Sequence, residues 1–377
     1  MGRSKPEAGI RARPLDMAVV QIKLPHHRYE ILIEPGVLGQ VGSRLREIMP
    51  HDRCGVVADR SVWDRHGETL REGLVSSDYE PVLATLEPGE SSKSLGVVEE
   101  VHGAFFDAHL ERRSPIVALG GGVAGDIAGF VAATHLRGVP FVQCPTTLLA
   151  MVDSSVGGKT GVNVPQGKNL LGAFHQPILV AADPLVLSTL PEREFRCGLA
   201  ECIKHAVIRD PGLFEFMGGR MSEIKALSTD VLVELIRRNV EIKADVVMED
   251  ERESGVRAHL NLGHTYGHAI EACAGYGRVL HGEAVALGMV AAMRTAIEFG
   301  ICPAHLEQEL VELLEAAGLP VKMELPALEE LESAMRMDKK VAGDRLRLVL
   351  PRRIGEVEIR DDVPEEAVRA GWDAIRS

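Results

Sequence analysis

Three short segments in the second half of the chain carry side chains that can hold a metal ion and move protons. Glu201 and Lys204 are three residues apart and His264 and His268 four apart, so each pair shares one face of a helix. Glu201, His264 and His281 together offer one carboxylate and two imidazoles, the ligand pattern of a catalytic zinc with an open position. The sequence lacks H-E-x-x-H, which excludes a zincin peptidase. Taken singly, each residue could equally be a helix cap or a satisfied core group.

A second chemical signal is a glycine-rich segment, residues 120–176. It holds eleven glycines, the cations Arg137, Lys159 and Lys168, and only two acids, in a chain whose net charge is −13. Glycine lets the main chain approach a ligand closely, and exposed N–H groups at a helix N-terminus attract anions. The segment therefore predicts a site for phosphate.

The start of this segment fits a dinucleotide-binding turn. Gly120–Gly125 satisfies G-x-G-x-x-G between an apolar strand-like run and a helical run. The acid that holds the ribose in an ordinary Rossmann unit is missing from residues 139–144, and Asp126 is an alternative partner. The competing interpretation is a glycine turn that only packs tightly on the sheet.

The end of the segment resembles a P-loop without being one. Gly158, Lys159 and Thr160 match its last residues, but Asp153 stands where the pattern requires glycine. A nucleoside-triphosphatase is therefore excluded. What remains is a predicted loop in which Lys159, Lys168 and Asn169 hold a phosphate monoester.

The elements that position these groups alternate between strand and helix in the first half. Residues 18–34 predict a hairpin that turns at Pro25–His27, and helical stretches at 37–48 and 95–108 lie between strand-like runs. Those runs are 54–58, 81–86, 116–119, 141–144 and 178–182. The alternation predicts a Rossmann-like parallel sheet with an antiparallel hairpin.

After residue 190 the pattern becomes mainly helical. Helices are predicted at 192–209, 229–248, 264–274, 281–299 and 303–317, with one late strand at 346–350. We therefore expect a disordered tail at 1–17, an α/β domain at 18–190 and a mainly α-helical domain at 191–377. A cleft between two such domains is a usual place for a ligand.

Composition narrows the class of protein. The 377 residues are 45% hydrophobic and 26% charged, as in ordinary globular proteins, and the low aromatic content (4%) with the acidic balance disfavours a nucleic-acid partner. The six cysteines form no C-x-x-C pair, which favours buried thiols in a reducing compartment. The sequence contains no bilayer-spanning apolar run and no secretory signal, so we expect a cytoplasmic protein without a membrane partner.

Longer runs carry a family resemblance. GGGVAGD, PTTLLAMVDSSVGGKTGVNVPQGKNLLGAFHQP, GLAECIKHAVI, NLGHTYGHAIE, HGEAVALGM and MDKKVAGDRLRLVL follow one another in order. From about residue 18 onward the chain resembles the 3-dehydroquinate synthase family. The resemblance implies a homodimer that uses NAD+ and one divalent metal ion, zinc or cobalt. The implied reaction converts 3-deoxy-D-arabino-heptulosonate 7-phosphate to 3-dehydroquinate and phosphate, a step of the shikimate pathway. It proceeds by transient oxidation at C5, phosphate elimination, re-reduction, ring opening and aldol closure.

The same resemblance implies roles for individual residues. The metal ligands are Glu201, His264 and His281. The catalytic and substrate residues are Asp153, Lys159, Asn169, Lys204, Lys243, Arg257, Asn261, His268 and Lys340 (with Lys339 adjacent), and Arg137 reaches across the dimer. The cofactor residues are Asp59, Pro88, Gly89, Glu90, Ser91, Ser92, Lys93, Gly122, Val123, Ala124, Gly125, Asp126, Thr146, Thr147, Lys159, Lys168, Val186, Leu187, Ser188 and Thr189.

Three alternatives remain open. Another sugar-phosphate cyclase, such as one that acts on an amino analogue, shares most of these motifs, although Lys243, Arg257 and His268 follow the dehydroquinate pattern. A metal-dependent polyol dehydrogenase would accumulate NADH and would not need the phosphate-binding lysines. A non-catalytic NAD-sensing protein fits poorly with the acid–base residues.

Overall fold

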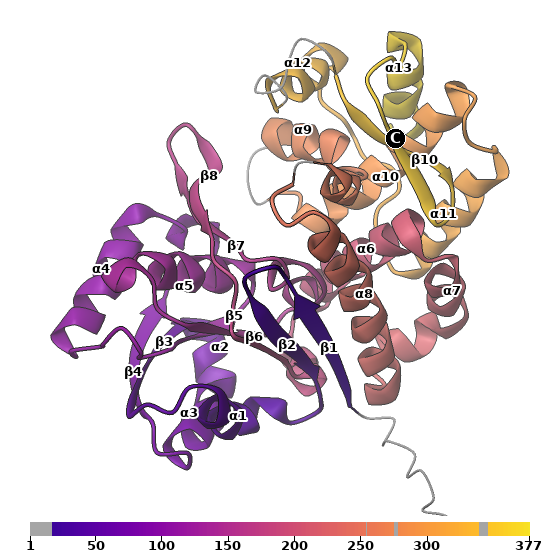
Figure 1. The fold of residues 1–377 in the computed structure, drawn as a ribbon. Coiled ribbons are helices and arrows are strands. Elements are labelled where there is room, and N and C mark those ends of the chain that lie inside the picture. Colours follow the sequence, from indigo (N-terminus) through magenta and orange to yellow (C-terminus); the bar gives the residue numbers. More distant parts are fainter. Residues whose placement is uncertain (1–16, 254, 275–277, 339–345) are drawn as a thin grey trace, which may run out of the picture.

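The fold is taken from a computed structural model that describes residues 17–253, 255–274, 278–338 and 346–377. Most of the predicted tail, and both Lys339 and Lys340, lie outside the described residues. The first half is built on a sheet and the second half is mainly helical (Figure 1).

A seven-stranded sheet organises the first half, in the order β1-β2-β9-β6-β5-β3-β4. Its strands are β1 (Ala18–Lys23), β2 (Arg28–Ile33), β3 (Arg53–Asp59), β4 (Glu80–Leu86), β5 (Ile116–Gly120), β6 (Phe141–Pro145) and β9 (Leu179–Ala182). Strand β1 runs antiparallel to β2, and every other neighbouring pair is parallel. The predicted hairpin and all five predicted strand runs are therefore present, and the fold class is confirmed.

The two faces of the sheet are buried against different partners. Val57 packs into a core with α4 (Leu95–Asp107) and α5 (Gly122–Thr134), whereas its neighbour Val56 faces the larger core that continues into the second half. Adjacent residues of a strand point to opposite faces, so both must be apolar where both faces are covered. The shorter helices of this half are η1 (Val37–Gln40), α1 (Val41–Ile48), α2 (Arg60–Val62), η2 (Trp63–Gly67), α3 (Glu68–Val75), η3 (Glu90–Ser92) and η4 (His135–Arg137).

The second half follows the predicted helices closely and adds elements that were not predicted. The predicted helices appear as α6 (Glu192–Arg209), α8 (Thr229–Glu249), α9 (His264–Ala274), α10 (His281–Glu298) and α11 (His305–Ala316). The additional elements are α7 (Pro211–Lys225), α12 (Leu328–Asp338), α13 (Glu365–Ala374) and β11 (Glu356–Arg360), which pairs with the predicted strand β10 (Leu348–Arg353).

The predicted phosphate loop is wrong in its secondary structure. Residues 159–174 form a β-hairpin, β7 (Lys159–Val164) and β8 (Gly167–Phe174), which stands out from the main sheet beside the helical half (Figure 1). The glycines of this segment interrupt the pattern by which a strand is recognised in the sequence. Two of them, Gly161 and Gly172, also let the two strands approach closely, since a Cβ on Gly172 would lie 2.2 Å from the carbonyl oxygen of Thr160. The two lysines are thus held on a paired ribbon rather than on an irregular loop.

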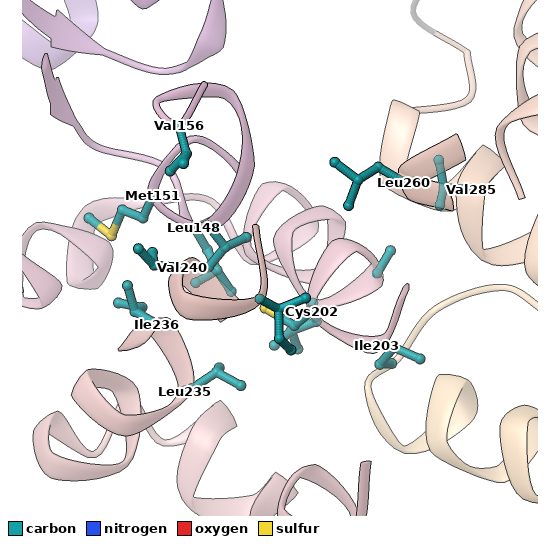
Figure 2. Close-up of a cluster of buried hydrophobic side chains, with 14 of the residues drawn as sticks. Leu148, Met151, Val156, Cys202, Ile203, Leu235, Ile236, Val240, Leu260 and Val285 are labelled. Atoms are coloured by element: carbon teal, nitrogen blue, oxygen red, sulfur yellow. The ribbon is translucent and has the colours of Figure 1, made fainter. Parts of the chain in front are cut away.

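One cluster of apolar side chains packs around the main-chain segments that carry the predicted metal and substrate residues. Met151 lies within η5 (Ala150–Ser154) and Val156 just after it, Cys202 and Ile203 come from α6 and Val240 from α8, and all are buried (Figure 2). Side chains that are packed this closely allow the main chain around them little movement. Each of these residues is within three positions of a predicted site residue. The packed core therefore restrains the backbone segments that carry the polar site residues.

Candidate metal and substrate site

The three predicted metal ligands converge from three helices. Glu201 on α6 is completely buried, and His264 and His281 are the first residues of α9 and α10. The Nε2 atoms of His264 and His281 lie 3.7 and 3.5 Å from Oε1 of Glu201. One donor atom from each residue lies within 4.8 Å of the others.

This donor set fits a divalent ion. Among the described residues, neither carboxylate oxygen of Glu201 accepts a hydrogen bond of normal geometry, although a buried carboxylate normally has such partners. Burial alone would raise the pKa of Glu201, but Lys204 and the two histidines hold it well below its ordinary value. An ionised carboxylate oxygen 3.7 and 3.5 Å from two imidazole nitrogens is a donor set suited to zinc or cobalt.

Two buried lysines and one aspartate surround the ligand set. Lys204 forms an ion pair with Glu201 one turn along α6, and Lys243 on α8 pairs with the carboxylate of Asp153 and donates to its carbonyl oxygen at 2.6 Å. Burial lowers the pKa of the Lys243 ammonium below its ordinary value. Burial would raise the pKa of Asp153, but Lys243 and Lys204 hold it below its ordinary value. Such perturbed, coupled groups are typical of proton-transfer sites.

Arg257 closes one side of this region. Its buried guanidinium donates to the carbonyl oxygens of Glu251 and Gly157, at 2.5 and 3.2 Å. Gly157 has φ +98°, and a Cβ there would lie 2.5 Å from the Arg257 side chain, so glycine is required. Lys159 begins β7 nearby and forms an ion pair with Glu253. Since a guanidinium has five N–H donors, Arg257 keeps some for a ligand.

The predicted cofactor residues meet at the carboxyl end of the sheet. Helix α5 begins after Gly121, and its Gly125 lies so near β6 that a Cβ would be 2.5 Å from the amide oxygen of Gln143. The third glycine of the motif thus permits close helix–strand packing. Lys93, buried, donates to both Asp126 and Asn169, which ties the 88–93 turn to α5 and to the β7–β8 hairpin.

The structure places the predicted ribose partner at the neighbouring strand end. Asp59 ends β3, and its Oδ1 caps α2 by accepting from the backbone N–H groups of Ser61 and Val62 at 2.8 and 3.3 Å. The 186–189 segment forms most of η6 (Pro184–Thr189), where Thr189 lies 2.7 Å from Nε2 of His66. Strand ends in an open parallel sheet are the usual site of a dinucleotide.

Not all predicted residues join one cluster. His268 lies one turn after His264, with ring centroids 5.4 Å apart, and Asn261 ends η7 (Val256–Asn261) just before them. Asn169, predicted to meet the phosphate, accepts a hydrogen bond from Lys93. Arg137 is exposed in η4 with φ +70°, and Leu136 before it has φ +48°.

Among the described residues, several that contact the predicted site were not predicted. Glu253 pairs with Lys159, Glu271 lies beside His281, and His205 lies 3.9 Å from Asp153. The motif runs contain Glu271 and His205, but their sequence positions do not reveal their partners. Glu253 sits in a polar stretch, residues 249–255, with no recognisable pattern.

Comparison with known proteins identifies the family. The 3-dehydroquinate synthase N-terminal model matches residues 83–197 and the C-terminal model residues 198–341. A 3-dehydroquinate synthase from Crocosphaera subtropica is 44% identical over 363 residues, which is 95% of this chain and 99% of the relative. Another, from Symbiobacterium thermophilum, is 46% identical and covers 94% of this chain and all of its own length. The chain belongs to the 3-dehydroquinate synthase family.

Solved structures of related cyclases share the fold. A 2-epi-5-epi-valiolone synthase from Streptomyces hygroscopicus with NAD+ and Zn2+ bound superposes with a TM-score of 0.86 at 29% identity, covering 94% of this chain and 98% of that one. A 2-deoxy-scyllo-inosose synthase in complex with carbaglucose-6-phosphate, NAD+ and Co2+ gives 0.86 at 26% identity, covering 95% and 100%. The predicted family is confirmed by these comparisons, and both of these solved cyclases hold NAD+ with a divalent metal ion, the cofactor pair predicted for this chain. Within the part of the chain that the structure describes, no helix is long and apolar enough to cross a membrane.

Proposed function

We propose that the chain converts 3-deoxy-D-arabino-heptulosonate 7-phosphate to 3-dehydroquinate and inorganic phosphate. The observation that carries this proposal is the convergence of Glu201, His264 and His281, with the buried Lys204 against the carboxylate of Glu201. Membership of the 3-dehydroquinate synthase family supports the choice of substrate. The same reasoning assigns NAD+ to the strand ends and the glycine-rich start of α5.

The residues of the chain would mainly orient the substrate and move protons. When bound, the divalent ion polarises substrate hydroxyl groups, and NAD+ accepts and returns one hydride. Lys243, whose ammonium has a lowered pKa, would exchange a proton with a substrate hydroxyl, and its pairing with Asp153 would hold it in position. Burial of Lys204 and Lys243 keeps water from competing for these protons.

Phosphate and carboxylate recognition would divide between two basic groups. Arg257 has N–H donors beyond the two used by backbone oxygens and can clamp a carboxylate in bidentate fashion. Lys159 on β7 is half-exposed, so its ammonium can leave Glu253 for a phosphate. Asn261 and His268, close to His264, would complete the substrate pocket together with Asn169.

The deciding experiment follows phosphate release and NADH together. We expect the purified chain, given the heptulosonate phosphate, NAD+ and Zn2+, to release one phosphate per 3-dehydroquinate formed with no net rise in absorbance at 340 nm. Stoichiometric NADH would identify a polyol dehydrogenase instead. Turnover of sedoheptulose 7-phosphate or an amino analogue in place of the heptulosonate would identify another cyclase.

We further propose a homodimer in which Arg137 acts in the partner's site. Arg137 is exposed. The projecting strand β8 also exposes three large apolar side chains, Leu170 (61% exposed), Leu171 and Phe174, which is unusual for a surface hairpin and typical of a contact surface. Mixing Arg137→Ala chains with Lys204→Met chains should restore up to about a quarter of the activity, because mixed dimers keep one intact site. No restoration would place Arg137 outside the partner's site.

Four further predictions concern the native metal, the domain boundary, the cellular location and the role of Lys340, and each has its own test. The native metal is zinc or cobalt, to be settled by metal analysis of protein purified from its own cells. The division at residues 190/191 is testable by limited proteolysis, and the cytoplasmic location by cell fractionation. The role of Lys340 is testable by comparing Lys340→Met with Lys339→Met.

A further inference from the structure

Glu271 occupies a position that the proposed chemistry has not used. It lies on α9, one turn after His268, with a side chain that is 14% exposed. Its Oε2 is 3.2 Å from Nδ1 of His281, and its Oε1 is 3.6 Å from Nζ of Lys168 on β8. One carboxylate therefore connects the helical half with the projecting hairpin.

The two histidines of the ligand set have matching arrangements. Nε2 of His281 faces Glu201 at 3.5 Å while its Nδ1 faces Glu271, so the ring nitrogens have separate partners. Likewise, Nε2 of His264 faces Glu201, and its Nδ1 lies 3.1 Å from the carbonyl oxygen of Leu262. An imidazole that binds a metal through Nε2 carries its proton on Nδ1, and each ring has an acceptor for that proton.

We propose that Glu271 is a positioning residue for the metal site, fixing the tautomer and ring orientation of His281 through one carboxylate oxygen while Lys168 pairs with the other. This inference rests on the proposed metal site. His281 needs such a partner more than His264 does. Its side chain is 37% exposed against 14%, so fewer neighbours restrain its ring.

A second use of the same groups is the main competitor. His268, Glu271 and His281 also bring one donor atom each within 4.8 Å of one another. A second ion there would need Nδ1 of His281 as a ligand. The proton that Glu271 accepts would then be absent, and His281 would bridge two ions. The two arrangements differ in the number of ions bound and in what removal of Glu271 does.

The test measures zinc binding by competition with a chromophoric chelator, using full-length wild-type, Glu271→Ala, Glu271→Gln and Glu330→Ala chains. Glu330 is an exposed carboxylate on α12, the helix that packs on α9, and its removal makes the same change in charge. We expect one ion per wild-type chain. Glu271→Ala should weaken binding about 10- to 100-fold. Glu271→Gln should lose less, because its amide oxygen still accepts from Nδ1. Glu330→Ala should stay within about twofold of wild type.

A spectroscopic readout separates positioning from general damage. The visible spectrum of bound Co2+ should change in Glu271→Ala and be unchanged in Glu330→Ala. Zinc affinity within about twofold of wild type in Glu271→Ala overturns the inference, and Glu271→Leu, which also cannot accept from Nδ1, supplies the same test if the alanine variant does not fold. Two ions in wild type and one in Glu271→Ala also overturn it, in favour of the second metal. A wild-type chain that binds no ion contradicts the metal site itself, whereas normal wild-type binding with an unaffected Glu271→Ala contradicts only this inference.

Discussion

Replacing Lys204 with methionine should make the stability of the protein depend strongly on metal. Lys204 and Glu201 form a fully buried ion pair, and removal of one partner leaves the other charge uncompensated. Breaking such a pair costs about 3–5 kcal/mol. Burial would lower the pKa of His281, but contacts with Glu201 and Glu271 raise it to about 10, so a protonated ring 3.5 Å away compensates part of the charge. We therefore expect a loss near 3 kcal/mol in the metal-free protein.

The assay is urea unfolding with EDTA and again with saturating Zn2+. A bound divalent ion beside Glu201 replaces the missing ammonium, so the loss in Lys204→Met should shrink to about 1 kcal/mol or less with zinc. Lys322→Met, which removes an exposed lysine, is the matched control and should show little change in either condition. Equal destabilisation of Lys204→Met with and without zinc would refute the reasoning, because the metal would then not share the charge of Glu201.

Three further changes probe the site separately. His264→Ala should lose bound zinc and turnover together, and normal zinc content with normal turnover would remove His264 from the ligand set. Lys159→Ala should weaken binding of a non-hydrolysable phosphonate analogue by about 1.5 kcal/mol, or roughly tenfold, the lower end for a charged hydrogen bond, because Lys159 is 49% exposed; unchanged affinity would exclude it from phosphate binding. The third change concerns His205, whose pKa is lowered by burial to about 4. Between pH 6.5 and 4 the unfolded chain therefore binds a proton at this residue that the native chain does not bind. Stability from this residue is complete above pH 6.5 and falls by about 3 kcal/mol as the pH drops to 4. Urea unfolding of His205→Gln should show a correspondingly flatter pH dependence, and the wild-type slope in that variant would contradict this.

The sequence predicts the main architecture because each half has a simple pattern. Doubly buried strands such as β3 and β5 read as short apolar runs, and α6 begins and ends where its period predicts. The β7–β8 hairpin escaped prediction because its glycines and exposed apolar residues give no alternation. Strand β11 does alternate charged and apolar residues, but the run is only five residues long and is completed by pairing with β10.

The sequence suggests candidate site residues but does not predict most of the contacts between them. Spacing along a helix places Lys204 against Glu201, since both are on α6. Nothing local indicates that Glu271 meets Lys168, because that contact joins two elements about a hundred residues apart. Asn169 gives a second example of a contact that the sequence does not predict. Its Oδ1 accepts a hydrogen bond from Lys93, 76 residues earlier in the chain, which no local pattern indicates. Such contacts depend on tertiary packing, which a single sequence does not encode locally.

The most direct test of the central claim follows the hydrogen at C5 of the substrate. The proposed reaction removes this hydrogen as hydride and returns it within one active site, so substrate deuterated at C5 should give 3-dehydroquinate that retains the deuterium. Mass spectrometry should then find one deuterium per product and none in free NADH. Unlabelled product, deuterated NADH in solution, or no 3-dehydroquinate at all would contradict the account.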